Sequence, residues 1–334
     1  MQTIDSGGRQ MAFVVDGSGR LLGTVTDGDI RRALLRGQGL DSLVTAAMNP
    51  NPVVKKPDTD LAQLQRQVVE RGARQVPVVD RNLVLIGVEE ASAGSKSTAK
   101  ANPVIIMAGG LGSRLFPLTQ DVPKPMLPIG GRPILETIVS NFAEQGFSKV
   151  FLSVNYKRDM IENHFGDGSR FGLAIDYLRE DTRLGTAGAL ALLPEVPDWP
   201  MVVMNCDVLT NIKFDRMLDF HQKQGAAATM AVREFDMQVP YGVVTVDEQS
   251  RIQAIDEKPT HRFFVNAGIY VLSPEVLRIL KPNESLDMPQ LFQQLRERGQ
   301  CTAAFPVCEY WIDVGQRQDL ERAEGEYNKI FGTV

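Results

Sequence analysis

Short apolar runs alternate with segments of helical spacing from residue 103 to the C-terminus. Residues 104–107 and 201–204 are apolar throughout, which is typical of strands buried on both faces. Between such runs, apolar residues recur three and four positions apart, as in 134–145 and 214–224, which are therefore predicted to be helices. Strands dominate after residue 226. The pattern predicts an α/β fold with a Rossmann-like, mainly parallel mixed sheet.

The first hundred residues follow a different, repeated pattern. Strand–turn–strand units are expected at residues 11–25 and 76–90, with a segment of helical spacing at 59–71 between them. They predict a smaller α+β domain. Residues 91–102 contain no apolar side chain larger than alanine, which is typical of a flexible linker. The expected boundaries are 1–92 for the first domain, 93–102 for the linker and 103–334 for the second domain.

Composition argues against two classes of partner. The 334 residues are 43% hydrophobic and 23% charged, as in ordinary globular proteins. No apolar run approaches the ~20 residues of a membrane span, and the first residues, MQTIDSGGRQ, have no apolar signal-peptide core. The formal net charge is −5 without a basic stripe, so neither a membrane nor a nucleic acid is expected. Three cysteines without metal-ligand spacing (Cys206, Cys301, Cys308) predict reduced thiols in the cytoplasm.

A glycine-rich loop follows the first strand of the second domain. Gly109, Gly110 and Gly112 leave backbone N–H groups open to an anion, and Arg114 and Lys124 add positive charge. No Lys-Ser/Thr pair follows, so this is not a Walker loop, and the third glycine of a dinucleotide fingerprint is missing. The alternative is a tight turn with solvated charges. We interpret the loop as a triphosphate cradle.

Carboxylates and a second glycine turn supply further candidates. Asp207 ends an apolar run, and Asp313 lies in Trp-Ile-Asp-Val-Gly, so either can offer oxygen to Mg²⁺ or simply begin a turn. Glu257-Lys258-Pro259 follows a predicted strand and, read alone, is an exposed turn. These segments follow strands, whose carboxyl ends bind ligands in such sheets, so they are expected to converge. Leu184-Gly185-Thr186-Ala187-Gly188 opens a short helix or merely caps it.

The run GGLGSRLFPLT…PKPMLPIGGRPIL resembles the signature of the sugar-1-phosphate nucleotidylyltransferases, which make nucleotide sugars and pyrophosphate. The later motifs Glu-Lys-Pro, Asn-Ala-Gly and Trp-x-Asp-x-Gly agree in order. The resemblance implies the nucleotide-diphospho-sugar transferase type of sheet and a Mg²⁺ cofactor. Leu-Gly-Thr-Ala-Gly is closer to the mannose-1-phosphate guanylyltransferases than to the thymidylyltransferases, which implies GTP, with Glu180 and Arg183 as candidate base contacts.

The same resemblance implies roles for matching residues. The implied catalytic residues are Arg114, Lys124 and Asp207, and the implied metal ligands are Asp207 and Asp313. Nucleotide-binding residues are expected at Met107, Ala108, Gly109, Gly110, Gly112, Ser113, Gly185 and Thr186. Sugar-phosphate contacts are expected at Gly242, Glu257, Lys258 and Asn266.

The N-terminal repeat resembles a pair of CBS modules, a regulatory domain. In that family a Thr-x-x-Asp after the second strand holds an adenine nucleotide, and here it is Thr26 and Asp29, which could equally cap a helix. The second copy lacks this motif. Only about ten residues precede Phe13, so the first module is expected to be truncated at its N-terminus. CBS modules usually pair between chains, which implies a homo-oligomer.

The combined domains resemble bacterial guanylyltransferases of the glucosamine-1-phosphate and mannose-1-phosphate type, which act in surface-sugar pathways. The implied reaction is Mg²⁺-dependent transfer of a nucleotidyl group from an NTP, here GTP, to a hexose or amino-sugar 1-phosphate, for surface-glycan precursor synthesis. The alternative is a nucleotide-sensing regulatory protein whose transferase-like domain does not turn over. The presence of Arg114, Lys124, Asp207 and Asp313 favours the enzyme.

Overall fold

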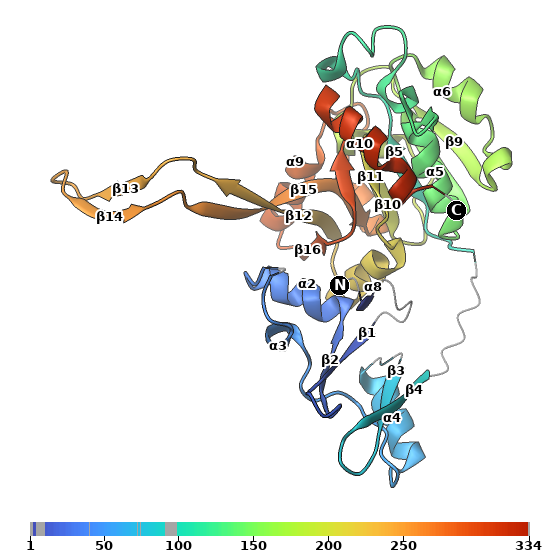
Figure 1. Ribbon diagram of the computed structural model, residues 1–334. Coiled ribbons are helices and arrows are strands. Elements are labelled where there is room, and N and C mark those ends of the chain that lie inside the picture. Colours follow the sequence, from blue (N-terminus) through green and yellow to red (C-terminus); the bar gives the residue numbers. More distant parts are fainter. Residues whose placement is uncertain are drawn as a thin grey trace. The chain divides into compact units, whose positions relative to one another are not determined.

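The computed structural model of the chain describes residues 3–4, 11–39, 41–71, 73, 75–90 and 99–332 (Figure 1). Contacts divide the chain into two compact units, Met1–Lys96 and Ser97–Val334. Most of the expected linker, up to residue 98, lies outside the described residues. Each unit is described by itself. Within the described residues, no helix combines the length and hydrophobicity that a bilayer crossing needs.

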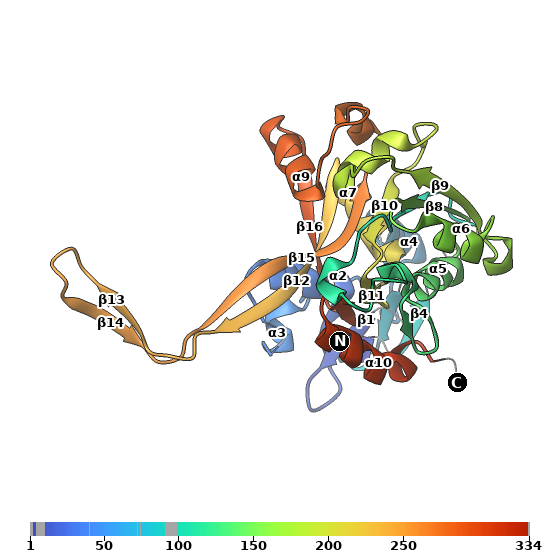
Figure 2. The same cartoon turned by 90° about the horizontal axis from the view of Figure 1, so that it is seen from above.

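A seven-stranded mixed sheet forms the centre of the second unit (Figure 2), which confirms the predicted fold class. Four of its strand pairs are parallel (β12–β16, β10–β5, β5–β8, β8–β9), and two are antiparallel (β10–β15, β12–β15). In spatial order the strands are β16 (Thr302–Val307), β12 (Ala228–Gln238), β15 (Thr260–Leu272), β10 (Met201–Asn205), β5 (Val104–Met107), β8 (Lys149–Val154) and β9 (Ala174–Arg179).

Helices cover both faces of this sheet because its central strands are apolar on both. In β5, Val104 and Ile106 point into one buried cluster, whereas Ile105 and Met107 point into the other. The first cluster includes residues of α5 (Ile134–Glu144), α6 (Arg158–Phe165), α8 (Phe214–Gln224) and α10 (Arg317–Ile330). The second includes residues of α7 (Gly185–Gly188) and α9 (Met288–Glu297).

Short elements complete the second unit and bear on its site. A two-stranded sheet of β11 (Val208–Thr210) and β17 (Trp311–Asp313) follows the end of β10. The remaining pieces are the β6–β7 hairpin (Pro128–Ile129, Arg132–Pro133) and the 3₁₀ turns η1 (Ser113–Leu115), η2 (Lys124–Met126), η3 (Ser169–Phe171), η4 (Ala189–Leu192) and η5 (Pro274–Ile279).

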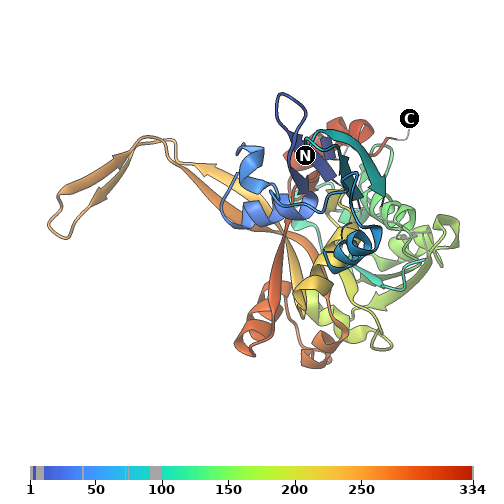
Figure 3. The ribbon, with the colours of Figure 1, turned by 90° about the horizontal axis from the view of Figure 1, so that it is seen from below.

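A long two-stranded arm projects from the sheet of the second unit (Figures 1 and 3). The outer halves of β12 and β15 form its base, and β13 (Val243–Val246) pairs with β14 (Ile252–Asp256) towards its tip. The sequence predicts these strands, but not their extension beyond the sheet.

The first unit contains the expected repeat. Its hairpins are β1 (Met11–Val15) with β2 (Leu21–Thr26), and β3 (Gln75–Val79) with β4 (Leu85–Glu90). Each hairpin has a register shift near the end of its first strand. The helices are α2 (Asp27–Leu35), α3 (Val44–Ala47) and α4 (Leu61–Arg71). Val53, Leu64 and Val76 form a small buried cluster in this unit.

Candidate active site

A pocket of about 330 Å³ opens where β5 and β10 end. Met107 and Asn205 are paired at the carboxyl ends of these parallel strands, so the loops that follow them meet at one edge of the sheet. Twelve residues predicted for the site line the pocket: Met107, Gly109, Gly110, Gly112, Ser113, Arg114, Lys124, Glu180, Arg183, Gly185, Thr186 and Asp207. Ala108 is fully buried beneath the loop.

The glycine loop is shaped by close contacts at two positions. Gly112 has a φ of +63°, and a Cβ there would lie 2.9 Å from the Cβ of Lys124 and 2.9 Å from Cγ2 of Thr119. A Cβ on Gly109 would lie 2.7 Å from Oε1 of Glu180, whereas nothing lies within 4 Å of one on Gly110. Larger residues therefore cannot replace Gly109 or Gly112 without movement, and the space over Gly110 is open to a ligand.

Lys124 is held against Asp207. Lys124 begins η2 after Pro123, and its Nζ lies 2.6 Å from Oδ2 of Asp207. The side chains are 9% and 17% exposed. Because the pair is largely desolvated, the two charges interact more strongly than a surface pair would. An anionic substrate can draw the ammonium towards itself and leave the carboxylate to a cation.

Backbone pairing brings Asp207 and Asp313 together. Val208 of β11 pairs with Asp313 of β17, and the backbone N–H of Val314 donates to the carbonyl oxygen of Asp207 at 2.8 Å. Burial raises the pKa of Asp313, and the neighbouring Asp207 charge raises it further, while Lys124 acts in the opposite direction. Two carboxylates held this close favour a cation between them.

Two buried oxygens of the site lack a hydrogen-bond partner within the described part of the chain. They are Oδ1 of Asp313 and Oδ1 of Asn205. Unpaired buried acceptors are costly, and a cation satisfies them. The described residues contain no group of three or more His, Cys, Asp or Glu side chains that could hold a metal. Two carboxylates and an amide oxygen nevertheless fit Mg²⁺, which binds through one or two carboxylates plus substrate phosphates.

Arg114 lies on the other side of Asp313. A Cβ on Gly315 would lie 3.2 Å from Nη1 of Arg114 and 3.4 Å from Oδ1 of Asp313. The glycine of Trp-x-Asp-x-Gly therefore leaves room for the guanidinium beside the carboxylate. Arg114 is exposed and lines the pocket, where it can meet a phosphate.

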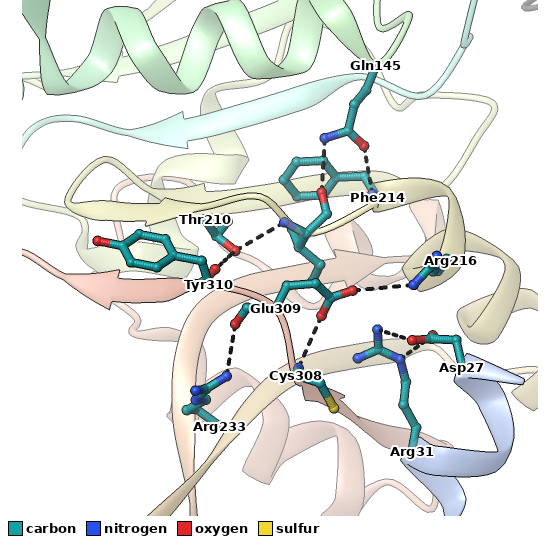
Figure 4. Close-up of polar contacts among 11 residues, drawn as sticks. Asp27, Arg31, Gln145, Thr210, Phe214, Arg216, Arg233, Cys308, Glu309 and Tyr310 are labelled. Atoms are coloured by element: carbon teal, nitrogen blue, oxygen red, sulfur yellow. Dashed lines mark hydrogen bonds and ion pairs between the residues drawn. The ribbon is translucent and has the colours of Figure 1, made fainter. Parts of the chain in front are cut away.

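The strand that carries Asp313 is fixed by a polar network (Figure 4). The Thr210 hydroxyl donates to the carbonyl of Tyr310 at 2.6 Å, just before β17. The same hydroxyl accepts from the N–H of Ile212 at 3.2 Å. Gln145 in turn donates to the carbonyl of Ile212 at 3.0 Å and accepts from the N–H of Phe214 at 2.9 Å. Beside β17, Arg216 pairs with Glu309 at 3.7 Å. These contacts limit the movement of β17 and therefore of its carboxylate.

Glu180 and the turn at Gly185 form the far side of the pocket. The Glu180 carboxylate accepts hydrogen bonds from Oγ of Ser153 at 2.5 Å and from the N–H of Leu184 at 3.0 Å. Gly185 has a φ of +76°, and the N–H of Thr186 donates to Asp287 at 3.0 Å. Asp287, just before α9, thus positions the turn, and no sequence motif predicts this role.

The residues expected to contact the sugar phosphate do not line the pocket. Gly242, Glu257 and Lys258 lie at the joint of the arm, which is the region between the β12–β15 pair and the β13–β14 pair. A Cβ on Gly242 would lie 2.9 Å from Oε2 of Glu257. Asn266 lies nearer the sheet. It donates to the Tyr270 hydroxyl at 2.8 Å and accepts from the N–H of Gly268 at 3.0 Å. The expected convergence thus holds for the loop and Asp207 but not for Glu257 and Lys258.

In the first unit, Thr26 and Asp29 form a capping box at the start of α2. The Thr26 hydroxyl donates to Asp29 at 2.6 Å, and the N–H of Asp29 donates back to Thr26 at 3.2 Å. The same helix carries an ion pair between Asp27 and Arg31 at 2.7 Å (Figure 4). The helix-capping alternative therefore accounts for both residues of the Thr-x-x-Asp motif.

Family models match both parts of the chain. The nucleotidyl transferase model matches residues 103–330, and the CBS domain model matches residues 2–36 and 44–88. The mannose-1-phosphate guanylyltransferase of Mycobacterium tuberculosis is 35% identical over 229 residues, which are 66% of this chain and 63% of that protein. The catalytic subunit beta of the Danio rerio mannose-1-phosphate guanylyltransferase is 36% identical over 225 residues, 65% of this chain and 62% of that protein. The chain thus spans less than two thirds of the length of these relatives.

Solved structures resemble the second unit. HddC from Yersinia pseudotuberculosis has a TM-score of 0.54 at 26% identity, covering 68% of this chain and 99% of its own. Another structure of HddC is complexed with GMP-PN. A putative glucose-1-phosphate thymidylyltransferase from Bacillus anthracis has a TM-score of 0.56 at 25% identity, covering 69% of this chain and 97% of its own.

Proposed function

The chain belongs to the nucleotidyl transferase family, and on that premise we propose that it transfers the guanylyl group of GTP to a hexose or amino-sugar 1-phosphate. The products are a GDP-sugar, a precursor for surface glycans, and pyrophosphate. The observation that carries this proposal is the pocket in which the glycine loop meets the Lys124–Asp207 pair, with Asp313 held next to Asp207 by the pairing of β11 with β17. It combines groups for a triphosphate with carboxylates for a cation.

The reaction needs positioning and charge neutralisation rather than a covalent intermediate. A phosphate oxygen of the sugar 1-phosphate attacks the α-phosphorus in line. The new P–O bond forms as the bond to the β-phosphate breaks, and pyrophosphate leaves with the bonding electron pair. The loop N–H groups from Gly109 to Ser113 hold the triphosphate, Arg114 neutralises the leaving pyrophosphate, and Lys124 contacts the reacting phosphates.

Asp207 and Asp313 would hold Mg²⁺, with Asn205 contributing its buried amide oxygen. The bound ion supplies charge neutralisation at the α-phosphate and the attacking phosphate. The orphaned Asp313 oxygen supports this assignment. Lys124 pairs with Asp207, and substrate phosphates would compete with that carboxylate for its ammonium.

Glu180 supports GTP as the nucleotide. Guanine presents two adjacent donors, N1–H and the 2-amino group, which match the oxygens of a carboxylate. Each Glu180 oxygen accepts one protein hydrogen bond, and a carboxylate has about four acceptor sites. Adenine presents an acceptor at N1 and would leave the buried carboxylate poorly paired, which is the stronger form of discrimination. The names of the guanylyltransferase relatives agree with this assignment.

We assign the sugar-phosphate and regulatory subsites by resemblance to the matching families. Gly242, Glu257, Lys258 and Asn266 would contact the sugar phosphate after the arm moves towards the pocket. A regulatory domain over residues 1–92 would bind an adenine nucleotide through Thr26 and Asp29. The three cysteines form no disulfide, which supports a cytoplasmic location.

Pyrophosphate release from a panel of NTPs and sugar 1-phosphates tests this function. We expect turnover with GTP and one or more hexose or amino-sugar 1-phosphates, in the presence of Mg²⁺ and not after chelation. Binding of GTP without pyrophosphate release from any combination would favour the regulatory alternative instead.

A further inference from the structure

The base of the arm has one apolar face. Beyond Arg233, β12 pairs only with β15, so residues 234–238 form a two-stranded ribbon with 260–264. The register places Phe235 opposite Phe263 and Met237 opposite His261. Directly opposed residues of an antiparallel pair lie on the same face, so these four side chains share one face. Phe235, Met237 and Phe263 are each at least half exposed.

The opposite face of the same ribbon is mostly polar. Arg262 pairs with Glu234 at 2.9 Å and with Asp236 at 3.0 Å, and Phe264 lies opposite Glu234. The ion pairs lie in solvent and keep this face hydrated. The base of the arm is therefore amphipathic, with one face suited to water and the other to burial.

The tip of the arm repeats this arrangement. Val244 pairs with Ile255 and Val246 with Ile252, and a register shift keeps all four side chains on one face. Their exposed fractions range from 49% to 63%. Thr245 pairs with Ala254 on the other face. Four β-branched aliphatic side chains are thus exposed together on a short hairpin.

The arm exposes much apolar area. The three apolar side chains at its base and the four at its tip together expose on the order of 700 Å². A standard interface buries about 800 Å² from each partner. A two-stranded ribbon is also only marginally stable in water unless something packs against it. The arm therefore exposes enough apolar area for an interface, and packing against a partner would stabilise it.

We propose that the arm pairs with the arm of a second copy of this chain, with their apolar faces packed together about a twofold axis. Such an interface uses the same surface on both copies, so charged side chains in it would bring like charges together. The paired positions on the two apolar faces include no Asp, Glu, Lys or Arg, so facing copies bring no like charges together. The outer edge of β12 beyond Arg233 pairs with no other strand of the described residues and can add backbone hydrogen bonds between copies.

Sedimentation of the full chain over a range of concentrations tests the proposal. The test variant is Ile255→Ser with Phe263→Ser, on the apolar faces. Its matched control is Ala254→Ser with Phe264→Ser, the adjacent residues on the opposite faces. We expect the dissociation constant of an arm-dependent dimerisation step to rise at least ~10²-fold in the test variant and to stay near wild type in the control.

Hydrogen exchange of the arm separates this interface from any other pairing surface. We expect amides of residues 243–256 to gain protection as wild-type concentration rises, and the test variant to lose that gain while exchange in β5 and β10 is unchanged. Concentration-independent exchange of the arm would overturn the proposal. So would equal effects of the test and control variants on association.

Discussion

The Lys124 ammonium lies 2.6 Å from the Asp207 carboxylate, although 83 residues separate the two in the chain. The pair joins the segment that follows the glycine loop to the end of β10. It places an ammonium and a carboxylate in the same small volume, where we propose that they meet the substrate phosphates and the metal. Removing the carboxylate charge should therefore affect catalysis, and it also leaves the Lys124 ammonium without its ion-pair partner.

The Asp207→Asn variant tests the role of the Asp207 negative charge in catalysis. We expect kcat to fall at least ~10²-fold, because the variant weakens the charge stabilisation of the transition state. Asp176→Asn is the matched control, since Asp176 forms an exposed ion pair with Lys149. Steady-state pyrophosphate release measures both. Near wild-type turnover in Asp207→Asn would remove Asp207 from the metal site.

Gly112→Ala tests the shape of the loop. The new Cβ would meet Lys124 and Thr119 at 2.9 Å in a left-handed backbone conformation. Gly131→Ala has the same backbone strain, at a φ of +79°, with nothing within 4 Å. We expect both variants to lose stability, but only Gly112→Ala to weaken GTP binding, by at least ~10-fold. Calorimetric titration with GTP distinguishes them, and equal affinities would show that the loop does not cradle the triphosphate.

Glu180→Gln tests whether Glu180 recognises the guanine base. A neutral amide offers one acceptor in place of two, so we expect kcat/KM for GTP to fall about 10–100-fold relative to that for ATP. Glu162→Gln controls for the loss of a carboxylate, because Glu162 pairs with Arg179 on the surface. An unchanged preference among NTPs in Glu180→Gln would contradict the assignment of Glu180 to guanine.

His221 gives a prediction for stability against pH. Its ring contacts the hydroxyls of Thr229 and Ser273, each at 2.9 Å, and burial lowers its pKa although Glu275 opposes the shift. The Ser273 hydroxyl donates to the carbonyl of Ala226, so it accepts a hydrogen bond from Nε2 of the ring. Below the unfolded pKa of about 6.5, the unfolded state binds the additional proton.

We therefore expect the free energy of unfolding of wild type to fall, relative to His221→Gln, as the pH drops below about 6.5. Above that pH the difference between the two proteins should be constant. Urea unfolding at several pH values measures it. A difference that does not change with pH would mean that His221 titrates alike in the folded and unfolded chains.

Deleting residues 1–95 tests the independence of the two units. Their division at residues 96 and 97 leaves the pocket entirely within the second unit. We expect basal transfer activity to remain within a few-fold of the full chain. A folded but inactive truncated enzyme, judged by circular dichroism and pyrophosphate release, would show that the units are catalytically inseparable.

Sequence patterns predict those parts of the site whose local signals are strong. The apolar run of β5 and the glycines after it locate the phosphate loop, because strand burial and left-handed turns leave direct marks in sequence. The closeness of Asp207 and Asp313 rests on the family resemblance, since the β11–β17 pairing that creates it joins segments about a hundred residues apart. The role of Asn205 cannot be predicted from the sequence around it, because Asn is common in the turns that follow strands.

Sequence patterns predict the strands of the arm but not how the arm extends from the sheet. Alternating residues predict β13 and β14, but alternation does not say which strands pair or whether a ribbon stays on its sheet. The sequence therefore predicts Glu257 and Lys258 at the edge of the sheet, whereas in the structure they lie between β14 and β15 in the arm. Their proposed contact with the sugar phosphate requires movement of the joint of the arm.

Analysis of the reaction products distinguishes guanylyl transfer from nucleotide binding alone. The full chain is incubated with Mg²⁺, a hexose or amino-sugar 1-phosphate and GTP labelled at the α-phosphate, and nucleotides are separated by anion exchange. We expect the label to move into a GDP-sugar in step with pyrophosphate release, and Asp207→Asn to slow both. Label that stays in GTP with every sugar 1-phosphate, despite tight GTP binding, would contradict it.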